Sequence, residues 1–442
     1  MFINQTRASD SVQIGPSSTT NFWIYQFKRT SLRTLISILE SVHTLRSLTA
    51  VPYLVAITVG VVGGRFLDYL TYMKPMWFGQ TLGLTFQISC TMIAMLLWLA
   101  TREYERLKGL SLLLFGALIL LWLLVTIRAR LDQSAFNYSA ITTPIVLAMI
   151  ILKAPRSSAA WRSADIAFAS LALAVVLSQA LDFTGLREAR QAPALVTRWP
   201  LFDLDFLPAY RWEGPFQDPN NAGLIGAMLV VYAMHRNGQL RNCLLIVGLP
   251  VVVFSESRTA IIALAVGLVI SLATSRQYVS RQRSRTFTTA IVLSLIATVV
   301  AIVWIFDPTL NGRVGIWKAF ANLTASEPLL GVGWSGIDLA ARTSQIPWQN
   351  VDGHNLVIDA SARHGLITGL LVLAVLSAAA LLALRARHND GGTSLSVLSV
   401  WLLGALTYTV TTWQYLGILM LPLLSALLIG TSCRTARPTC HP

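Results

Sequence analysis

Charged residues are scarce in this sequence. Asp, Glu, Lys and Arg make up 12% of the 442 residues, whereas hydrophobic residues make up 54%. A soluble protein would carry about 25% charged residues, so the composition excludes an ordinary soluble enzyme. With a mean hydropathy of +0.61, the chain is predicted to be an all-α, polytopic integral membrane protein with one membrane domain.

Cysteine is also rare, and several common catalytic motifs are absent. Cys90 and Cys243 lie in or beside apolar segments, and Cys433 and Cys440 lie in the C-terminal tail. No pair falls in an outer loop, so no disulfide framework is expected, and no Cys/His spacing indicates a metal site. The sequence has no Walker loop, G-x-S-x-G or H-E-x-x-H motif, which argues against the chemistries that these motifs support.

Apolar runs bounded by charged residues predict about twelve transmembrane helices. Their approximate limits are 48–64, 82–100, 110–127, 139–152, 166–181, 222–234, 242–255, 259–274, 287–306, 366–384, 393–412 and 415–432. Several are shorter than the ~20 residues of a straight span, so one or two re-entrant segments are the alternative.

These limits divide the chain into a cytoplasmic N-terminal arm (1–47), a membrane domain (48–432) and a cytoplasmic tail (433–442). Apolar residues in segment 22–47 favour a helix on the inner membrane surface, with a disordered arm as the alternative. A large outer loop is expected before the tenth helix.

The basic residues favour an N-terminus in the cytoplasm. In that orientation the inner segments hold 21 of the 34 Lys and Arg and 6 of the 20 Asp and Glu, which is the positive-inside pattern. The pI of 10.1 is therefore an orientation signal, and nucleic-acid binding is disfavoured. The two large outer loops, 182–221 and 307–365, face the other side and are where we expect a site.

His354 is the first candidate for chemistry. Of the six histidines, His354 and His364 lie in outer segments. A neutral imidazole near the bilayer surface can accept a proton from a hydroxyl, and the alternative is a hydrogen-bonded surface histidine. His364 directly precedes Gly365 and is interpreted as a helix-end residue.

Arg258 lies in a short polar break between two apolar runs. An arginine at membrane depth is costly unless it binds something, and its planar guanidinium suits phosphate oxygens. The alternative is an ion pair with Glu256 or another acidic residue, or an extended side chain that reaches water.

Arg313 precedes a predicted helical face formed by Trp317, Phe320 and Leu323. A helix N-terminus combined with a guanidinium would form an anion site. The alternative is a helix that anchors the chain at the membrane surface.

Arg211 opens a third candidate region, in which Gly214 and Pro215 favour a defined turn. Arg211 is a candidate contact for an anionic ligand. Asn220 or Asn221 is expected to cap the helix that follows.

Residues 354–368 contain His354-Asn355, nine further residues, Gly365, two residues and Thr368. This order resembles the signature of the O-antigen ligase and polymerase superfamily, in which His and then Asn, Ser or Gln are followed after nine residues by Gly, and three positions later by Gly, Thr or Tyr. The polar break around Arg258, the pair Arg313 and Trp317, and the turn at Gly214 also resemble this superfamily. The resemblance covers about residues 48–432 and leaves 1–47 unexplained.

The resemblance implies an inverting, metal-independent glycosyltransferase of the bacterial inner membrane that uses no cofactor. It would take a glycan from a polyprenyl-diphosphate carrier on the periplasmic side. His354 would activate the acceptor hydroxyl, and Arg258 and Arg313 would bind the diphosphate. The expected substrate contacts are Arg211, Asn355, Trp317 and Lys318.

The His-Asn signature favours an O-antigen ligase, with lipid A–core as the acceptor. The alternative is an O-antigen or exopolysaccharide polymerase, whose acceptor is a second lipid-linked glycan. A transporter is disfavoured, because polar residues gather in the outer loops and no internal repeat is visible. The sugar, the acceptor and the oligomeric state stay open.

Overall fold

The structure is a computed structural model of the chain. It describes residues 52–71, 76–100, 110–132, 146–147, 157–183, 212, 214–216, 218–274, 313–346, 353–387, 389–407, 422–427 and 429. The predicted N-terminal arm and C-terminal tail lie outside these residues.

Helices dominate the described residues, and no strand occurs among them. In chain order the elements are α2 (Pro52–Thr71), α3 (Met76–Ala100), α4 (Leu110–Asp132), α6 (Ser157–Phe183), the short 3₁₀ helix η1 (Gly214–Phe216), α7 (Pro219–Ala233), α8 (Gly238–Ser255), α9 (Arg258–Thr274), α11 (Arg313–Ser326), α12 (Gly333–Arg342), α13 (Leu356–His364), α14 (Leu366–Ala386) and α15 (Thr393–Thr407). The predicted all-α class is confirmed for this part of the chain.

Four of these helices are long and apolar enough to cross a membrane: Leu112–Asp132, Ser158–Ala180, Gly238–Ser255 and Leu366–Ala386. The first of them leaves Leu113, Leu120 and Leu123 exposed. A row of exposed leucines is unfavourable in water and favourable against lipid. The helices therefore support a membrane protein.

Nine of the twelve expected spans coincide with described helices, namely α2, α3, α4, α6, α7, α8, α9, α14 and α15. The expected spans 139–152, 287–306 and 415–432 lie wholly or mainly outside the described residues. The number of twelve membrane helices, and the outer position of the large loop, therefore stay predictions.

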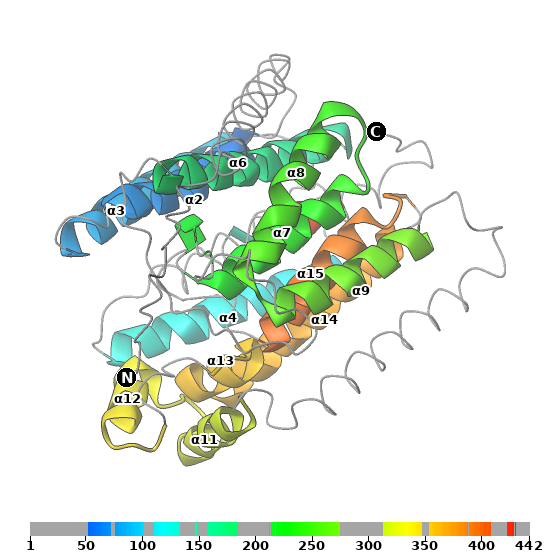
Figure 1. The fold of residues 1–442 in the computed structure, drawn as a ribbon. Coiled ribbons are helices and arrows are strands. Elements are labelled where there is room, and N and C mark those ends of the chain that lie inside the picture. Colours follow the sequence, from blue (N-terminus) through cyan, green and yellow to red (C-terminus); the bar gives the residue numbers. More distant parts are fainter. Residues whose placement is uncertain are drawn as a thin grey trace, which may run out of the picture.

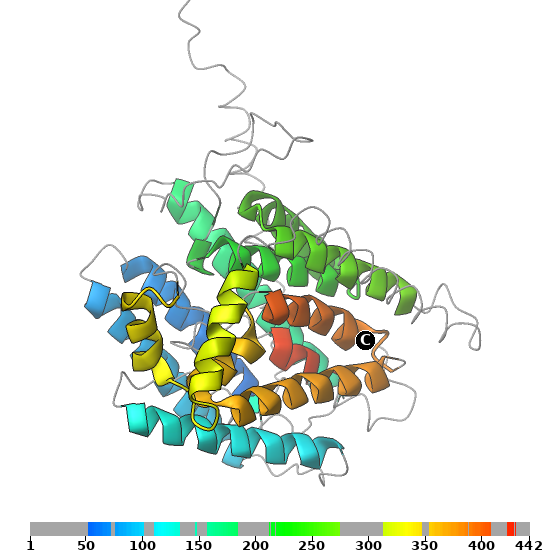
Figure 2. The same cartoon turned by 90° about the horizontal axis from the view of Figure 1, so that it is seen from below.

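Helix α7 is the most deeply buried element, since every residue from Asn221 to Ala233 is buried. It packs against α8, α9 and α15, and Figure 1 shows it in the interior of the bundle. Gly226 and Gly248 allow the closest approach of α7 and α8, because a Cβ on Gly226 would lie 2.9 Å from the Gly248 carbonyl oxygen. Figure 2 shows α4 running beside α14, and these two helices are in contact.

The shorter helices α11, α12 and α13 gather at one end of the bundle (Figure 1). Ile316 and Phe320 of α11 pack with Ile337 and Ala340 of α12 and with Ala362 of α13 in a small core of their own. This core fixes the start of α11 next to the start of α13, where two of the candidate residues lie.

A polar cluster joins α6, α7, α9 and α15 at the end of the bundle opposite α11, α12 and α13. Arg236, just after α7, pairs with Asp165 of α6, and the Tyr232 hydroxyl donates to the same carboxylate at 2.7 Å. His235 Nε2 lies 3.0 Å from Ser271 Oγ and 2.9 Å from Ser396 Oγ. All of these residues fall at the helix ends that the alternation of spans assigns to the inner side.

The first prediction concerns this orientation. In a cysteine-free background, Gln345→Cys should react with a membrane-impermeant maleimide in intact spheroplasts, and Gln239→Cys should react after permeabilisation. Both glutamines are exposed and lie on opposite sides in the expected topology, so they form a matched pair. The reverse labelling pattern would invert the topology.

Candidate active site

The candidate residues lie at the starts of four helices. Asp218 is the N-cap of α7, and Asn355 is the N-cap of α13. Arg258 and Arg313 are the first residues of α9 and α11. The first turn of a helix presents unpaired N–H groups and a partial positive charge, so each of these positions favours a negatively charged group nearby.

Asn355 fixes the entry into α13. Its Oδ1 accepts the N–H groups of Val357 at 3.0 Å and Ile358 at 3.1 Å, and its Nδ2 donates to the Leu406 carbonyl of α15 at 2.9 Å. The short helix α13 follows, and His354 itself stays outside it. These bonds tie the Asn355 side chain to the backbone of α13 and α15, directly after His354, and its expected contact with substrate stays a prediction.

His354 is half-buried and has a left-handed backbone, with φ of 47°. Burial lowers the pKa of its imidazole, and the positive charge of Arg313 lowers it further, whereas Asp218 and Asp359 act in the opposite direction. The net effect is a lowered pKa, so the ring is neutral at pH 7. The same electrostatic effects show that Arg313 and Asp218, remote in sequence, lie near His354.

Arg313 owes its position to the packing of α11. Phe320, two turns further on, is fully buried in the small core. It also presses on Gly353, where an added Cβ would lie 3.1 Å from both Phe320 Cδ1 and Asp359 Cβ. The predicted helical start at Arg313 is confirmed, and the helix brings this arginine to the histidine.

Arg258 lies at a sharp reversal between α8 and α9. Glu256 ends α8 with a left-handed φ of 48°, and Ser257 Oγ accepts the Ala260 N–H at 3.2 Å. The same hydroxyl donates to Asn220 Oδ1 at 3.0 Å. This bond ties the start of α9 to the start of α7, and it places the exposed Arg258 at the end of the bundle where Asp218 lies.

The prediction that Asn220 or Asn221 caps α7 is wrong. The cap is Asp218, whose Oδ1 accepts the N–H of Asn220 at 2.7 Å and that of Asn221 at 3.1 Å. Pro219 is the first helical residue, and proline favours that position because its φ is already helical. The Asp-Pro pair was therefore the available signal in the sequence.

The turn predicted before α7 is confirmed. Gly214, Pro215 and Phe216 form η1 and are buried, and Gly214 has a left-handed φ of 52° in close contact with the Trp212 ring. The Trp212 N–H donates to the Phe254 carbonyl at 2.9 Å, which ties this turn to the end of α8. Arg211 lies outside the described residues.

The two remaining expected substrate contacts lie in the first turns of α11. Lys318 is exposed and Trp317 is half-buried. Trp317, four residues after Arg313, lies on the same face of α11, whereas Lys318, five residues after it, is turned by about 140° around the helix.

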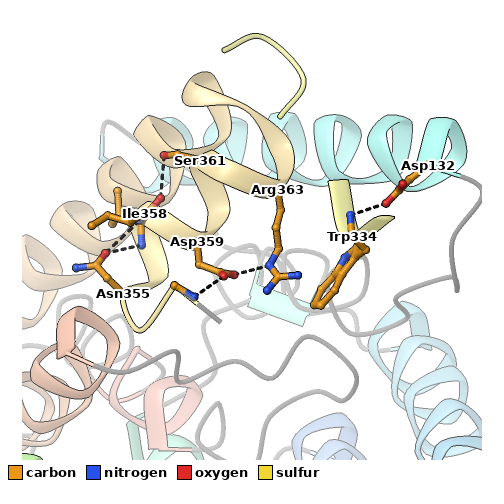
Figure 3. Close-up of polar contacts among 9 residues, drawn as sticks. Asp132, Trp334, Asn355, Ile358, Asp359, Ser361 and Arg363 are labelled. Carbon is orange, nitrogen blue, oxygen red and sulfur yellow. Dashed lines mark hydrogen bonds and ion pairs between the residues drawn. The ribbon is translucent and has the colours of Figure 1, made fainter. Parts of the chain in front are cut away.

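Asp359 and Arg363 form an ion pair that was not predicted from the sequence. Arg363 Nε donates to Asp359 Oδ2 at 2.9 Å, and both side chains have no exposed surface. The Arg363 guanidinium lies 3.6 Å from the centre of the Trp334 ring, as Figure 3 shows. The spacing of four residues between an acid and a base on one helix was the signal that could have revealed this pair.

His364 ends α13, as predicted for a helix-end residue, but it is buried. Burial and the neighbouring Arg363 lower the pKa of His364 to about 4. Among the described residues, no three His, Cys, Asp or Glu side chains come together as a metal site.

The other signature residues have structural roles. Gly365 joins α13 to α14 with a φ of 92°, and a Cβ there would lie 2.1 Å from the Leu329 carbonyl oxygen. Thr368 is buried, and its hydroxyl donates to the His364 carbonyl at 2.8 Å. Of the four signature residues, His354 is the one with a titratable side chain.

Residues 243–374 match the family model of O-antigen ligase. The matched stretch includes Arg258, Arg313 and His354 and excludes Asp218, and it confirms the predicted relation to the O-antigen ligase and polymerase superfamily. No curated protein matches the chain.

The second prediction concerns Gly365. Gly365→Ala should destabilise the protein by roughly 2–5 kcal/mol, since it adds backbone strain to an overlap with the Leu329 carbonyl. The measurement is the thermal midpoint in detergent. Gly315→Ala is the matched control, because nothing lies within 4 Å of a Cβ there and alanine favours the helix. Equal midpoints for the two variants would contradict the close packing at Gly365.

Proposed function

We propose that the protein is an inverting, metal-independent glycosyltransferase of the bacterial inner membrane that acts as an O-antigen ligase. Its donor would be a glycan on a polyprenyl diphosphate, and its acceptor a hydroxyl of lipid A–core at the periplasmic face. The observation that carries the proposal is the half-buried His354 within electrostatic reach of Arg313, in the stretch that matches the O-antigen ligase family model.

In this mechanism His354 takes the proton of the acceptor hydroxyl. The acceptor oxygen then forms a bond to the anomeric carbon of the donor, on the face opposite the diphosphate. The bond from that carbon to the diphosphate oxygen breaks with both electrons, so the configuration inverts. A neutral imidazole is required for the first step, which agrees with the lowered pKa of His354.

The leaving diphosphate gains negative charge as its bond to the sugar breaks. Arg258 and Arg313 supply guanidinium groups for its oxygens, and each begins a helix, whose partial positive charge adds to the effect. Such fixed positive groups act most strongly where charge develops in the transition state. Arg211, Trp317 and Lys318 are proposed as further substrate contacts, and Asn355 as the residue that sets the position of His354.

The third prediction tests this function with purified protein in proteoliposomes that contain a lipid-linked glycan donor. With lipid A–core present and a chelator added, the glycan should move to lipid A–core. His354→Ala should lower this turnover by roughly 10²–10⁴-fold, the usual contribution of one acid–base group. Wild-type turnover should fall as the pH drops through the pKa of His354, which is lowered from its ordinary value, because the protonated ring cannot accept a proton.

His235→Ala is the matched control, since His235 is also half-buried but lies at the other end of the bundle. It should lose stability with its two serine contacts and keep its turnover per folded molecule. If the glycan grew on the lipid-linked donor and none moved to lipid A–core, the function would be that of a polymerase and not of a ligase. Full turnover of His354→Ala would remove the base assignment.

The fourth prediction separates shape from charge at the arginines. Arg258→Lys and Arg313→Lys keep a positive charge and lose the planar guanidinium that binds two phosphate oxygens at once. Each should lower turnover by about tenfold or more, up to the ~10²–10³-fold known for loss of one transition-state donor. Arg342→Lys, at an exposed position of α12, should leave turnover unchanged. Near-normal turnover of both site variants would show that they supply only a diffuse positive field.

A further inference from the structure

Asp359 and Arg363 form an ion pair in the interior of the end that carries His354. Both side chains have no exposed surface, and Arg363 Nε lies 2.9 Å from Asp359 Oδ2. Burying two charges is costly, and a pair of this kind is weak evidence for stability by itself. Stability alone therefore does not explain the pair, and its contacts indicate another role.

The second oxygen of Asp359 holds the residue that precedes the histidine. Oδ1 accepts the Gly353 N–H at 3.0 Å, and Gly353 is enclosed between Asp359 and Phe320. The next residue, His354, has a left-handed φ of 47°. A residue other than glycine keeps such a backbone only where its surroundings hold it, and the bond from Asp359 to Gly353 supplies part of that hold.

Arg363 in turn fixes the Asp359 carboxylate. Its guanidinium stacks on the Trp334 ring at 3.6 Å, and the backbone N–H of Trp334 donates to Asp132 Oδ2 at the end of α4 at 2.6 Å. Figure 3 shows Arg363 between Asp359 and Trp334, with Asp132 on the far side of Trp334. A continuous set of contacts thus runs from α4 through α12 and α13 to the backbone beside His354.

We infer that Asp359 is a positioning residue for His354, held in place by the stack of Arg363 on Trp334. The carboxylate fixes the Gly353 amide, and this sets the backbone from which the imidazole projects toward the acceptor hydroxyl. The inference rests on the proposed function of His354 as the base.

Asp359 also contributes charge to the site. The charged groups acting on His354 are Arg313 of α11, Asp218 at the start of α7 and Asp359 of α13. Asp359 raises the pKa of His354, so its neutralisation lowers that pKa further. The acid limb of the rate profile then moves to lower pH, a change that a loss of fold alone would not produce.

The fifth prediction uses Asp359→Asn, which is close in shape and lacks the charge. Turnover per folded molecule should fall roughly 10- to 100-fold, the effect of a small misplacement of a catalytic group. The KM for the lipid-linked donor should change little, because the diphosphate contacts lie elsewhere. The acid limb should move to lower pH. A reading independent of transfer is the rate at which diethyl pyrocarbonate modifies His354 across pH, followed by mass spectrometry, and its midpoint should move the same way.

Asp390→Asn is the matched control. Asp390 is also buried and accepts backbone N–H groups, from Gly392 at 2.8 Å and Ser394 at 3.1 Å, but it lies in the turn between α14 and α15. Its substitution should lower the thermal midpoint and leave both the turnover per folded molecule and the titration of His354 as in the wild type.

A double variant covers the case in which Asp359→Asn does not fold. Asp359→Asn with Arg363→Met removes both buried charges, and exchanging a buried ion pair for uncharged side chains is often tolerated. The double variant should fold and show the same move of the acid limb.

The outcomes separate the two proposals. Wild-type turnover and titration in the Asp359 variants, with an inactive His354→Ala, would overturn the positioning role and leave the proposed function intact. Full activity of His354→Ala would show that His354 is not the base. A shifted modification profile of His354 in Asp359→Asn would then still show that Asp359 acts on His354.

Discussion

Two side chains hold the chain where it enters α13. Asn355 caps the helix from its start, and Asp359 reaches back from the first turn to the Gly353 amide. Between these two bonds lies His354 with its left-handed backbone. The rest of the site depends on this short stretch, because α11 and its Arg313 are packed against it through Phe320 and Gly353.

The site thus combines hydrogen bonds that hold the backbone at His354 with arginines that are at most partly buried. Arg258 and Arg313 begin helices and are exposed or half-buried, whereas the ion pair of Asp359 and Arg363 is fully buried. This separation agrees with the proposed anionic substrate. In the proposed mechanism Arg258 and Arg313 would meet the incoming diphosphate, and the buried pair would hold the backbone beside His354 without competing for it.

The sequence predicted the helical class, most helix positions and the helix end at His364. These predictions succeeded because apolar runs and a glycine after a helix are local signals. Asp218 was missed because two asparagines competed with it for the same cap. Asn and Asp are about equally favoured as N-caps, and the signal that distinguishes them is Pro219, directly after Asp218.

The enclosed pair of Asp359 and Arg363 was missed for a different reason. Its spacing is visible in the sequence, but such a spacing normally marks an exposed helix face. Burial came from α12 and Trp334, which lie some thirty residues earlier in the chain. Long-range packing of this kind has no local signature, and the nearness of Arg313 and Asp218 to His354 has none either.

The tight reversal between α8 and α9 sets the depth of the site. Helix α8 has 18 residues, and at about 1.5 Å per residue it is about 27 Å long, close to the ~30 Å thickness of a bilayer's hydrocarbon core. Because α9 begins within three residues of the end of α8, Arg258 would lie at headgroup level in the expected topology. The proposed polyprenyl-diphosphate donor carries its charged group at that same level, so it would enter the site sideways with its lipid tail still in the membrane.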